Sequence, residues 1–433
     1  MKHLNIDFSR VIGPVKQMNG INCGPLTRNF HDDARPWFKE ARIPFSRLHD
    51  CENPYGSGEF VDVDSIFKVF KCDPDDPECY NFRLTDEYLK AITECGTGIL
   101  YRLGCAIDFQ YHIHTVPPKD YLKWAKIVEH IILHYNYGWA DGLHLNIRDW
   151  EIWSEPDTKN IWYGEWEEFF SFYKVTVTYL KNRFPDLRFG GSDIANIEGG
   201  FLRSFLEYMT KDGSHVPYDF CTYQCYMREP DDCVKRAEYA RNILHEFGYD
   251  DTEIVCSEWN YVQNWQNMPE SFRLIKKEHG AAFCAALMCA MQNSPANRAA
   301  YYVAHPKSGW CGLFSKGTSM VNGGGAIVER EKPYYAFKAY AAIAAQKDRV
   351  EASIEEGNVY VLAAAGEKKT VMLSNYKEEG AVLEKIRLNF SDSETVFEVL
   401  RTDKRNTEAS IGRVKSGDVL SMPKDSIVLL KEI

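Results

Sequence analysis

The stretch WEIWSEPDT, residues 150–158, contains a short apolar and aromatic segment followed by an acid. Trp150–Trp153 has the composition of a buried strand, and Glu155 stands two residues beyond it, fixed against Pro156. Proline lacks a backbone N–H and therefore suits the point at which a strand passes into a loop. A lone buried carboxylate is costly unless it is paired, hydrogen-bonded or protonated. Glu155 therefore raises the question of a second carboxylate.

Segments like this one recur from about residue 40 to 345 and alternate with longer amphipathic segments. In residues 120–135, for example, apolar side chains recur at helical spacing on one broad face. About eight strands that alternate with helices predict a (β/α)8 barrel, also known as a TIM barrel, of the α/β class. The predicted strands are Met18–Asn22, Ile43–Leu48, Ile99–Leu103, Trp150–Trp153, Arg188–Gly190, Phe220–Tyr223, Glu253–Cys256 and Ala299–Val303.

The pattern changes after about residue 345. Short strands follow one another, with turn signals such as Ser416-Gly417-Asp418 and no segment of helix length between them. This pattern is typical of a small antiparallel β-sandwich. We therefore predict a catalytic barrel at residues 10–345 and a C-terminal β-sandwich domain at residues 346–433, which residues 1–9 can join with a further strand.

Charge and composition narrow the class of partner. The 433 residues carry a formal net charge of -11, and the longest basic clusters are two residues long. Nucleic acids and anionic membrane surfaces both require basic patches, so neither is predicted as a partner. The N-terminal residues lack an apolar signal core, and the 13 cysteines include no CxxC pair. We expect a cytoplasmic protein with reduced, mostly buried thiols, and self-association is left open.

A second acid stands in a similar setting. Glu258 lies in EIVCSEWNY, residues 253–261, at the end of a predicted strand and next to Trp259. Glu155 then ends the fourth barrel strand and Glu258 the seventh, so both acids are expected at the mouth where catalytic groups of barrels gather. Glycoside hydrolysis needs one protonated and one ionised carboxyl group, and mutual repulsion helps to separate their pKa values. The alternative is two ordinary acids held by ion pairs.

The segments EIWSEPD (151–157) and CSEWN (256–260) resemble the acid/base and nucleophile motifs of clan A glycoside hydrolases. More narrowly they resemble glycoside hydrolase family 39, which includes β-xylosidases and α-L-iduronidases. Further segments that resemble the family are MNGINCGP (18–25), FSRLHD (45–50), DPECYNFRLTDEYLKAI (76–92), PPKDYLKWAKIV (117–128) and EKPYYAFKAY (331–340).

The resemblance implies a retaining double displacement on a carbohydrate substrate, with β-xylosidase-like activity. Glu155 would be the acid/base and Glu258 the nucleophile, with their carboxyl groups roughly 5–5.5 Å apart. Arg47 would steady the nucleophile and keep it ionised, although a purely structural salt bridge is the alternative for this arginine. His49 would bind a sugar hydroxyl, and the hydroxyl of Tyr226 would bond the nucleophile. No cofactor and no metal are predicted.

Two positions depart from the family pattern near the acids. Ser154 stands where clan A enzymes usually have an asparagine that contacts the nucleophile and the sugar 2-hydroxyl. Serine is shorter and cannot donate two amide protons, so either the 2-position of the sugar differs, Asn260 compensates, or catalysis is weak. Gln224 stands where β-xylosidases often have histidine, and its role as sugar contact or filler is left open.

The eighth strand departs as well, because the family often has a tryptophan platform where Tyr302 stands. Tyr302, His305 or Trp310 could replace it. Two further hypotheses are therefore kept beside a family 39 glycosidase of open sugar specificity. One is a carbohydrate-binding barrel with weakened catalysis. The other is a metal-dependent hydrolase that uses His112 and His114 of YHIHT, because this spacing lets two ligands share a strand.

Overall fold

The computed structural model describes the chain except for residues 27–31, 50, 52–59, 109–110, 306–310 and 316–325. Eight parallel strands form one sheet in the order β7-β6-β5-β4-β2-β10-β9-β8, and backbone hydrogen bonds such as Gly191 N to Phe220 O (2.9 Å) join β7 to β8. This closure makes a (β/α)8 barrel and confirms the predicted fold. The strands are β2 (Gln17–Asn22), β4 (Phe45–Arg47), β5 (Gly98–Leu103), β6 (Asp149–Ile152), β7 (Arg188–Gly190), β8 (Phe220–Met227), β9 (Glu253–Tyr261) and β10 (Arg298–Tyr301).

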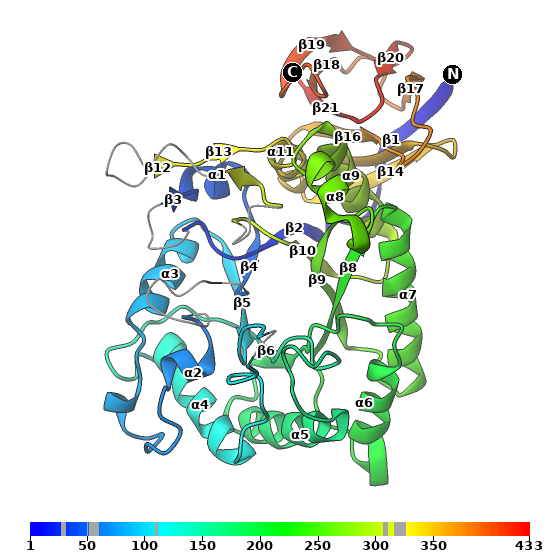
Figure 1. The fold of residues 1–433 in the computed structure, drawn as a ribbon. Helices are drawn as coiled ribbons and strands as arrows, with labels where there is room; N and C mark the ends of the chain where they lie inside the picture. The colour runs from blue at the N-terminus through cyan, green and yellow to red at the C-terminus, as the bar shows by residue number, and fades with distance from the viewer. Residues whose placement is uncertain (27–31, 50, 52–59, 109–110, 306–310, 316–325) are drawn as a thin grey trace.

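Helices follow the barrel strands and surround them (Figure 1). The helix predicted at 120–135 begins after Asp120, whose side chain accepts from the N–H of Lys123, and ends at Gly138 in the left-handed conformation. No helix in the described part of the chain is long and apolar enough to cross a membrane. The helices are α1 (Arg35–Glu40), α2 (Val63–Ile66), α3 (Arg83–Thr93), α4 (Tyr121–Tyr137), α5 (Trp166–Arg183), α6 (Phe201–Thr210), α7 (Pro230–Glu246), α8 (Met268–Ile275), α9 (Glu278–Ala290) and α11 (Tyr334–Ala344), with 3-10 turns η2 (Pro77–Cys79), η3 (Lys211–Gly213), η4 (Trp265–Asn267) and η5 (Met291–Asn293).

A second, nine-stranded sheet is largely antiparallel, as the sequence predicted for the C-terminal part, with the order β19-β18-β21-β16-β15-β14-β1-β17-β20. Strand β1 runs to Pro14, beyond the predicted residues 1–9, and pairs with both β14 and β17. The strands are β1 (Lys2–Pro14), β14 (Asp348–Ile354), β15 (Val359–Ala365), β16 (Lys369–Asn375), β17 (Glu384–Phe390), β18 (Phe397–Thr402), β19 (Ala409–Val414), β20 (Val419–Met422) and β21 (Ser426–Glu432); short pairs elsewhere are β3 (Asp32–Asp33) with β12 (Ala326–Ile327) and β11 (Phe314–Ser315) with β13 (Glu329–Arg330).

Helix α9 connects the two sheets. Its residues from His279 to Cys289 are all buried, as expected for a helix that is apolar all round. It packs against β9 on one side and against β15, β16 and β21 on the other. Ser374 of β16 donates a hydrogen bond to the carbonyl of Ala282 (2.7 Å). Helix α9 thus ties the barrel to the second sheet.

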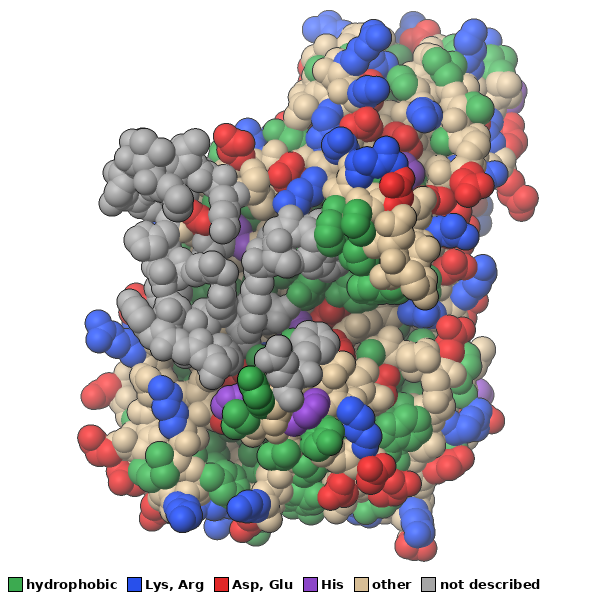
Figure 2. Space-filling view, in the orientation of Figure 1, with side chains coloured by type: hydrophobic (Ala, Val, Ile, Leu, Met, Phe, Trp, Pro, Cys, Tyr) green, Lys and Arg blue, Asp and Glu red, His purple; other side chains and the backbone are tan. Residues whose placement is uncertain are grey.

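The surface carries both signs of charge. Figure 2 shows one face of the molecule, on which lysine and arginine are interspersed with aspartate and glutamate over the barrel rim and the second sheet. A mixed surface of this kind creates no strong field of one sign. Among the described residues on this face, the charge distribution is typical of an ordinary solvated surface.

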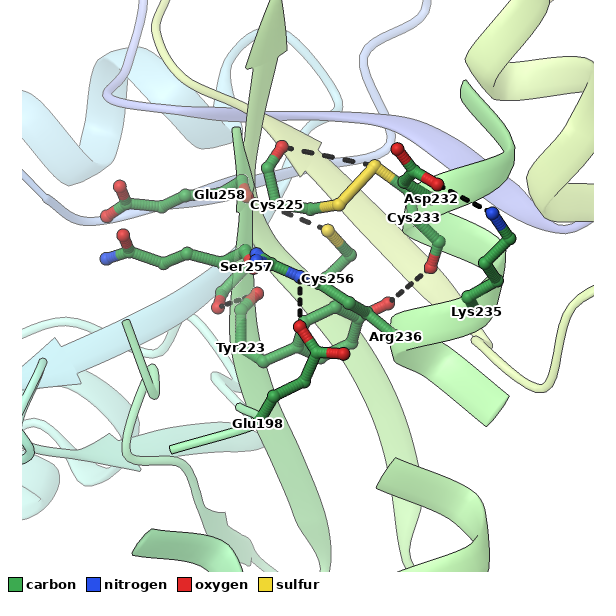
Figure 3. The surroundings of a disulfide bond; sticks show 11 residues. Glu198, Tyr223, Cys225, Asp232, Cys233, Lys235, Arg236, Cys256, Ser257 and Glu258 are labelled. Carbon is green, nitrogen blue, oxygen red and sulfur yellow. Dashed lines mark hydrogen bonds and ion pairs between the residues drawn. A yellow bond between two sulfur atoms is a disulfide. The ribbon is translucent and has the colours of Figure 1, made fainter. Parts of the chain in front are cut away.

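One pair of cysteines is joined, which corrects the expectation that the thiols are reduced. Cys225 on β8 and Cys233 near the start of α7 form a disulfide, with their Cα atoms 5.8 Å apart. The chain turns directly from β8 into α7, so two residues eight positions apart come into contact. Side chains alternate along a strand, so Cys225 points to the opposite side from Gln224 and Tyr226. Figure 3 shows the disulfide on the α7 side, with the side chain of Glu258 pointing away from it.

Removing this disulfide should destabilise the protein without changing the barrel. We expect Cys233→Ser to lower the free energy of unfolding by about 2–3 kcal/mol, because the bond closes a short loop in the unfolded chain. Denaturant unfolding without reductant measures this change. The matched control is Cys221→Ser, a buried free thiol on the same strand. Added reductant should weaken the wild type and this control equally, and a wild type that reductant leaves unchanged would contradict the prediction.

Candidate active site

Glu258 lies inside a barrel strand rather than at its end. The predicted strand stopped at Cys256, but β9 continues to Tyr261. Ser257 is an extra residue in the ladder with β8, and the register with β10 also shifts nearby. Such a β-bulge re-aims side chains and is common next to active sites. The bulge therefore lets the strand continue while Glu258 points into the barrel.

Glu155 lies three residues after β6 in a constrained loop. Its φ is +43° and that of Trp153 is +71°, a backbone region that side chains other than glycine rarely adopt. The backbone N–H of Glu155 donates to the carbonyl of Asp193 (3.2 Å), and the carbonyl of Glu155 accepts from Thr158 (3.0 Å). Strained residues of this kind cluster at functional sites, where the surrounding structure holds them.

The two glutamates meet. One carboxylate oxygen of Glu155, one of Glu258 and a ring nitrogen of His49 all lie within 4.8 Å of one another. The carboxyl groups of retaining glycosidases are about 5–5.5 Å apart, whereas inverting pairs are separated by about 6.5–9.5 Å. The observed proximity matches the shorter class. The same three side chains could also hold a cation, since carboxylate oxygen and imidazole nitrogen are common metal ligands.

Each oxygen of Glu258 has a strong donor. The guanidinium of Arg47 on β4 donates from Nη1 to Oε1 (2.7 Å), and the hydroxyl of Tyr226 on β8 donates to Oε2 (2.6 Å). The Nε2 atom of His49 lies 3.3 Å from Oε1. Arg47 and Tyr226, which the resemblance assigned to the nucleophile, both contact Glu258, and His49, which it assigned to a sugar hydroxyl, lies beside the same carboxylate.

The fully buried Arg47 also holds residues that the sequence analysis did not single out. Its Nε donates to Glu151 of β6 (2.6 Å), and its Nη1 donates to Asn22 of β2 (3.1 Å). Its Nη2 lies 2.9 Å from Oδ2 of Asp193 and donates to the hydroxyl of Ser154 (3.2 Å). One guanidinium thus contacts three carboxylates, which is more than a simple salt bridge to Glu258.

Asp193 follows β7 and lies between the two glutamates. Ser154, the residue before Glu155, donates to its Oδ2 (2.9 Å), and Ser257, the residue before Glu258, donates to its Oδ1. Gln224 donates to Oδ2 of Asp193 (3.0 Å) and to Oε1 of Glu155 (2.7 Å). Gln224 is therefore a direct partner of Glu155, and the hydroxyl proton of Ser154 is used within the protein.

Two signals in the sequence could have revealed the missed acids. Asp193 stands three residues after β7, as Glu155 stands three residues after β6. Glu151 is a charged residue inside an otherwise apolar strand, which is itself unusual. Both signals are local and weak, because many acids follow strands without entering a site.

The pKa values in this cluster are shifted because several carboxylates are buried close together. Burial, and then the charge of Asp193, raise the pKa of Glu258 well above its usual value although Arg47 opposes them. Arg47 lowers the pKa of Glu258, in the expected direction, but Glu151 and Asp193 share its charge. Burial and then Asp193 also raise the pKa of Glu155, to about 8. Glu258 accepts from a guanidinium and a phenol, whereas Glu155 accepts from a neutral amide. A single proton shared by the two carboxyl groups is therefore more stable on Glu155.

The remaining predicted residues are placed differently. The ring centroid of Tyr302 lies 6.2 Å from that of His49 and 6.0 Å from that of Tyr226, so it borders the carboxylate pair. Asn260 is fully buried and bonds the backbone, donating to the carbonyl of Tyr302 and accepting from Tyr261 (2.7 Å), so both ends of its amide are engaged within the protein. The ring of His305 packs on Phe314 (5.2 Å). Trp310 lies outside the described residues.

The two histidines of the metal hypothesis do not act together. His114 contacts Asp64, whereas His112 stacks on Tyr163 with ring centroids 4.1 Å apart. Among the described residues, the one group with ligand atoms close enough for a metal ion is His49, Glu155 and Glu258. The structure therefore gives no support to a metal centre built on His112 and His114.

Fold and site together define a (β/α)8 barrel in which two glutamates, Glu155 and Glu258, face each other with their nearest oxygens within 4.8 Å. The family model for glycosyl hydrolases family 39 matches residues 53–266. This match covers just under half of the chain and confirms the resemblance to the family seen in its motifs.

Known proteins support this classification. A β-xylosidase from Geobacillus stearothermophilus is 25% identical over 237 residues, 47% of this chain and 46% of that protein. A β-xylosidase from Caldicellulosiruptor saccharolyticus is 24% identical over 290 residues, 59% of this chain and 55% of that protein. The matched region thus spans about half the length of these relatives. The solved structure of a glucosidase from Croceicoccus marinus is 21% identical and shares the fold, with a TM-score of 0.79, over 100% of this chain and 98% of that one.

Proposed function

We propose that this protein is a retaining glycosidase that cleaves O-glycosidic bonds by double displacement. The observation that carries the proposal is the pair of glutamates whose nearest oxygens lie within 4.8 Å, one with cationic and phenolic donors and the other with a neutral amide. The first environment suits a nucleophile and the second suits a proton donor. Glu258 is thus the nucleophile and Glu155 the acid/base.

In the first step, an oxygen of Glu258 attacks the anomeric carbon while the bond from that carbon to the leaving oxygen breaks. The proton of Glu155 passes to the leaving oxygen, and a glycosyl ester remains on Glu258. In the second step, Glu155 removes a proton from water, the water oxygen attacks the anomeric carbon, and the ester bond to Glu258 breaks. Two inversions give net retention of configuration.

The neighbouring residues have defined tasks in this scheme. Arg47 and Tyr226 hold one oxygen of Glu258 each, which fixes the plane of the attacking carboxylate. When the nucleophile becomes an ester its charge is lost, and Arg47 then keeps Glu151 and Asp193 as counterions. His49 and Tyr302 border the same space and are the proposed contacts to the reacting sugar, through a hydrogen bond and an aromatic face.

The proposed substrate class is a β-xyloside-like glycoside. It is supported by the two β-xylosidase relatives, while the glucosidase neighbour shares the fold alone. The hydroxyl of Ser154 donates its one proton to Asp193, so this proton is not available for a sugar 2-hydroxyl. A panel of aryl xylosides, glucosides, 2-substituted glycosides and uronic acid glycosides resolves the preference.

A mechanism-based inactivator tests the reaction itself. Incubation with an activated 2-deoxy-2-fluoro glycoside should trap the glycosyl ester, and peptide mass analysis should find the label on Glu258. Labelling of Glu258 requires both nucleophilic attack and departure of the leaving group. Binding of sugar without labelling would instead favour a carbohydrate-binding barrel, and labelling of another acid would overturn the assignment.

The activity should persist to unusually high pH for a carboxylic acid catalyst. Glu155 must carry its proton to act as acid, and burial with Asp193 raises its pKa to about 8. A raised pKa keeps the protonated form present above the usual value of 4.5, so kcat/KM should fall only as the pH rises through about 8. The pH dependence of kcat/KM on a glycoside with a poor leaving group measures this limb. A fall in kcat/KM that is centred below pH 6 would contradict the prediction.

A further inference from the structure

Asp193 has an unusual set of partners. It is fully buried, and its two carboxylate oxygens accept from Ser154, Gln224 and Ser257 and pair with Arg47. Three of these four groups contact Oδ2, and Ser257 contacts Oδ1. Two of the donors, Ser154 and Ser257, directly precede the proposed catalytic glutamates in the chain. Asp193 therefore ties the loop after β6 to residues within β8 and β9.

The orientation of Gln224 follows from this arrangement. Its side chain faces an oxygen of Glu155 at 2.7 Å and an oxygen of Asp193 at 3.0 Å. Both partners are carboxylates, so the amide nitrogen must face them and its two protons are both engaged. If Gln224 turned its amide oxygen to Glu155, it would also lose its bond to Asp193. Asp193 thus fixes Gln224, and Gln224 fixes the acceptor side of Glu155.

The consequence concerns the acid proton. Oε1 of Glu155 accepts from Gln224, so this oxygen is the poorer place for a proton and Oε2 is the better one. Glutamine does not titrate, so it orients the acid without adding a cation beside it. The charged or titratable groups that face Glu155 are Asp157 in its own loop, Asp193 after β7, Glu258 on β9, and Arg47 and His49 at the end of β4.

We propose that Asp193 is a positioning residue that, through Gln224, fixes which oxygen of Glu155 carries the transferable proton. This inference rests on the proposed role of Glu155 as the acid. Asp193 stays ionised, because Arg47 and the hydrogen-bond donors lower its pKa although burial opposes them. Its negative charge then disfavours ionisation of Glu155, while the N–H of Gln224 favours it. Two neighbouring residues thus act on the same proton in opposite directions.

Two substitutions separate these effects. Asp193→Asn removes the charge and keeps the shape, so Glu155 should lose its proton at a pH lower by about one unit or more. Gln224→Met removes the amide donor and keeps the length, so the proton should be held to a pH higher by about half a unit or more. A residue with a merely structural role would lower activity without shifts of opposite sign.

The measurement is a ¹³C NMR titration of the carboxyl groups in glutamate-labelled protein, with the Glu155 signal assigned by its loss in Glu155→Gln. The basic limb of kcat/KM is followed in parallel. Asp219→Asn is the matched control, because Asp219 accepts from Phe189 (2.8 Å) and thus also bridges β7 and β8, but at their opposite ends. It should leave the Glu155 titration unchanged.

Gln224→Met does not disturb the contacts of Arg47, so it remains informative if Asp193→Asn fails to fold. Opposite shifts support the proposal, and absent shifts or shifts of the same sign overturn it. The NMR titration needs no turnover. A wild type that titrates as described but hydrolyses no glycoside would refute the proposed function, whereas a wild type that hydrolyses glycosides without these shifts would refute the role of Asp193.

Discussion

Glu258→Ala should lower kcat/KM by at least about 10⁴-fold on every accepted glycoside, a loss of the size seen when an enzyme loses its nucleophile. Arg47 donates to one oxygen of Glu258 and Tyr226 to the other. Among the described residues, Glu258 is the carboxylate that lies within 4.8 Å of both Glu155 and His49. Without the carboxylate, the glycosyl ester cannot form. The cavity left by the side chain should admit a small anion, so azide should restore turnover and give a glycosyl azide of inverted configuration.

The control for this variant is Glu253→Gln. Glu253 lies at the start of the same strand, where it pairs with Arg188 and Arg298 away from the carboxylate pair. Its loss should reduce thermal stability and leave kcat/KM within a few fold of the wild type. Product configuration by ¹H NMR distinguishes rescue at the anomeric carbon from residual wild-type enzyme. A rescued product of retained configuration would refute the nucleophile role of Glu258.

Glu155→Ala should act selectively. With poor leaving groups such as alkyl or sugar alcohols, kcat/KM should fall by about 10²–10⁴-fold, the range typical of a lost general acid. With an activated aryl leaving group that needs no proton, the first step should be affected far less and the glycosyl ester should accumulate. Azide should then attack this ester and give a product of retained configuration, the opposite of the result for Glu258→Ala.

A plot of log kcat/KM against the pKa of the leaving group measures this selectivity. Its slope should be steep for Glu155→Ala and shallow for the wild type. Asp157→Asn is a matched control, because Asp157 lies in the same loop but its carboxylate bonds the backbone of Ala195 and Asn196. It should not change the slope. An equal loss on all leaving groups in Glu155→Ala would refute the acid/base role.

The eight barrel strands could be predicted because each is a short apolar run that can be recognised from its own residues. Such a run must be buried on both faces. Glu155 stood out for the same reason, since a carboxylate next to such a run conflicts with its surroundings. The end of β9 could not be placed in this way. The bulge at Ser257 depends on how β9 pairs with β8 and β10, and no local feature of the sequence encodes that register.

Arg47, His49 and Tyr226 were found by resemblance to a family, and the structure brings all three to Glu258. Asp193 was missed, although its side chain contacts Ser154, Gln224, Ser257 and Arg47 around the two glutamates. The bond between Cys225 and Cys233 was missed as well, because pairing depends on the direction in which α7 leaves β8.

By itself, the sequence determined the barrel and the second sheet and singled out the two glutamates, since hydrophobic period and an acid beside an apolar run are properties of single segments. Only the tertiary structure decided how charge is shared among these acids. A pKa in a dry cluster depends on distances between residues from different strands, so the opposing influences of Arg47 and Asp193 on Glu258 arise when the barrel closes.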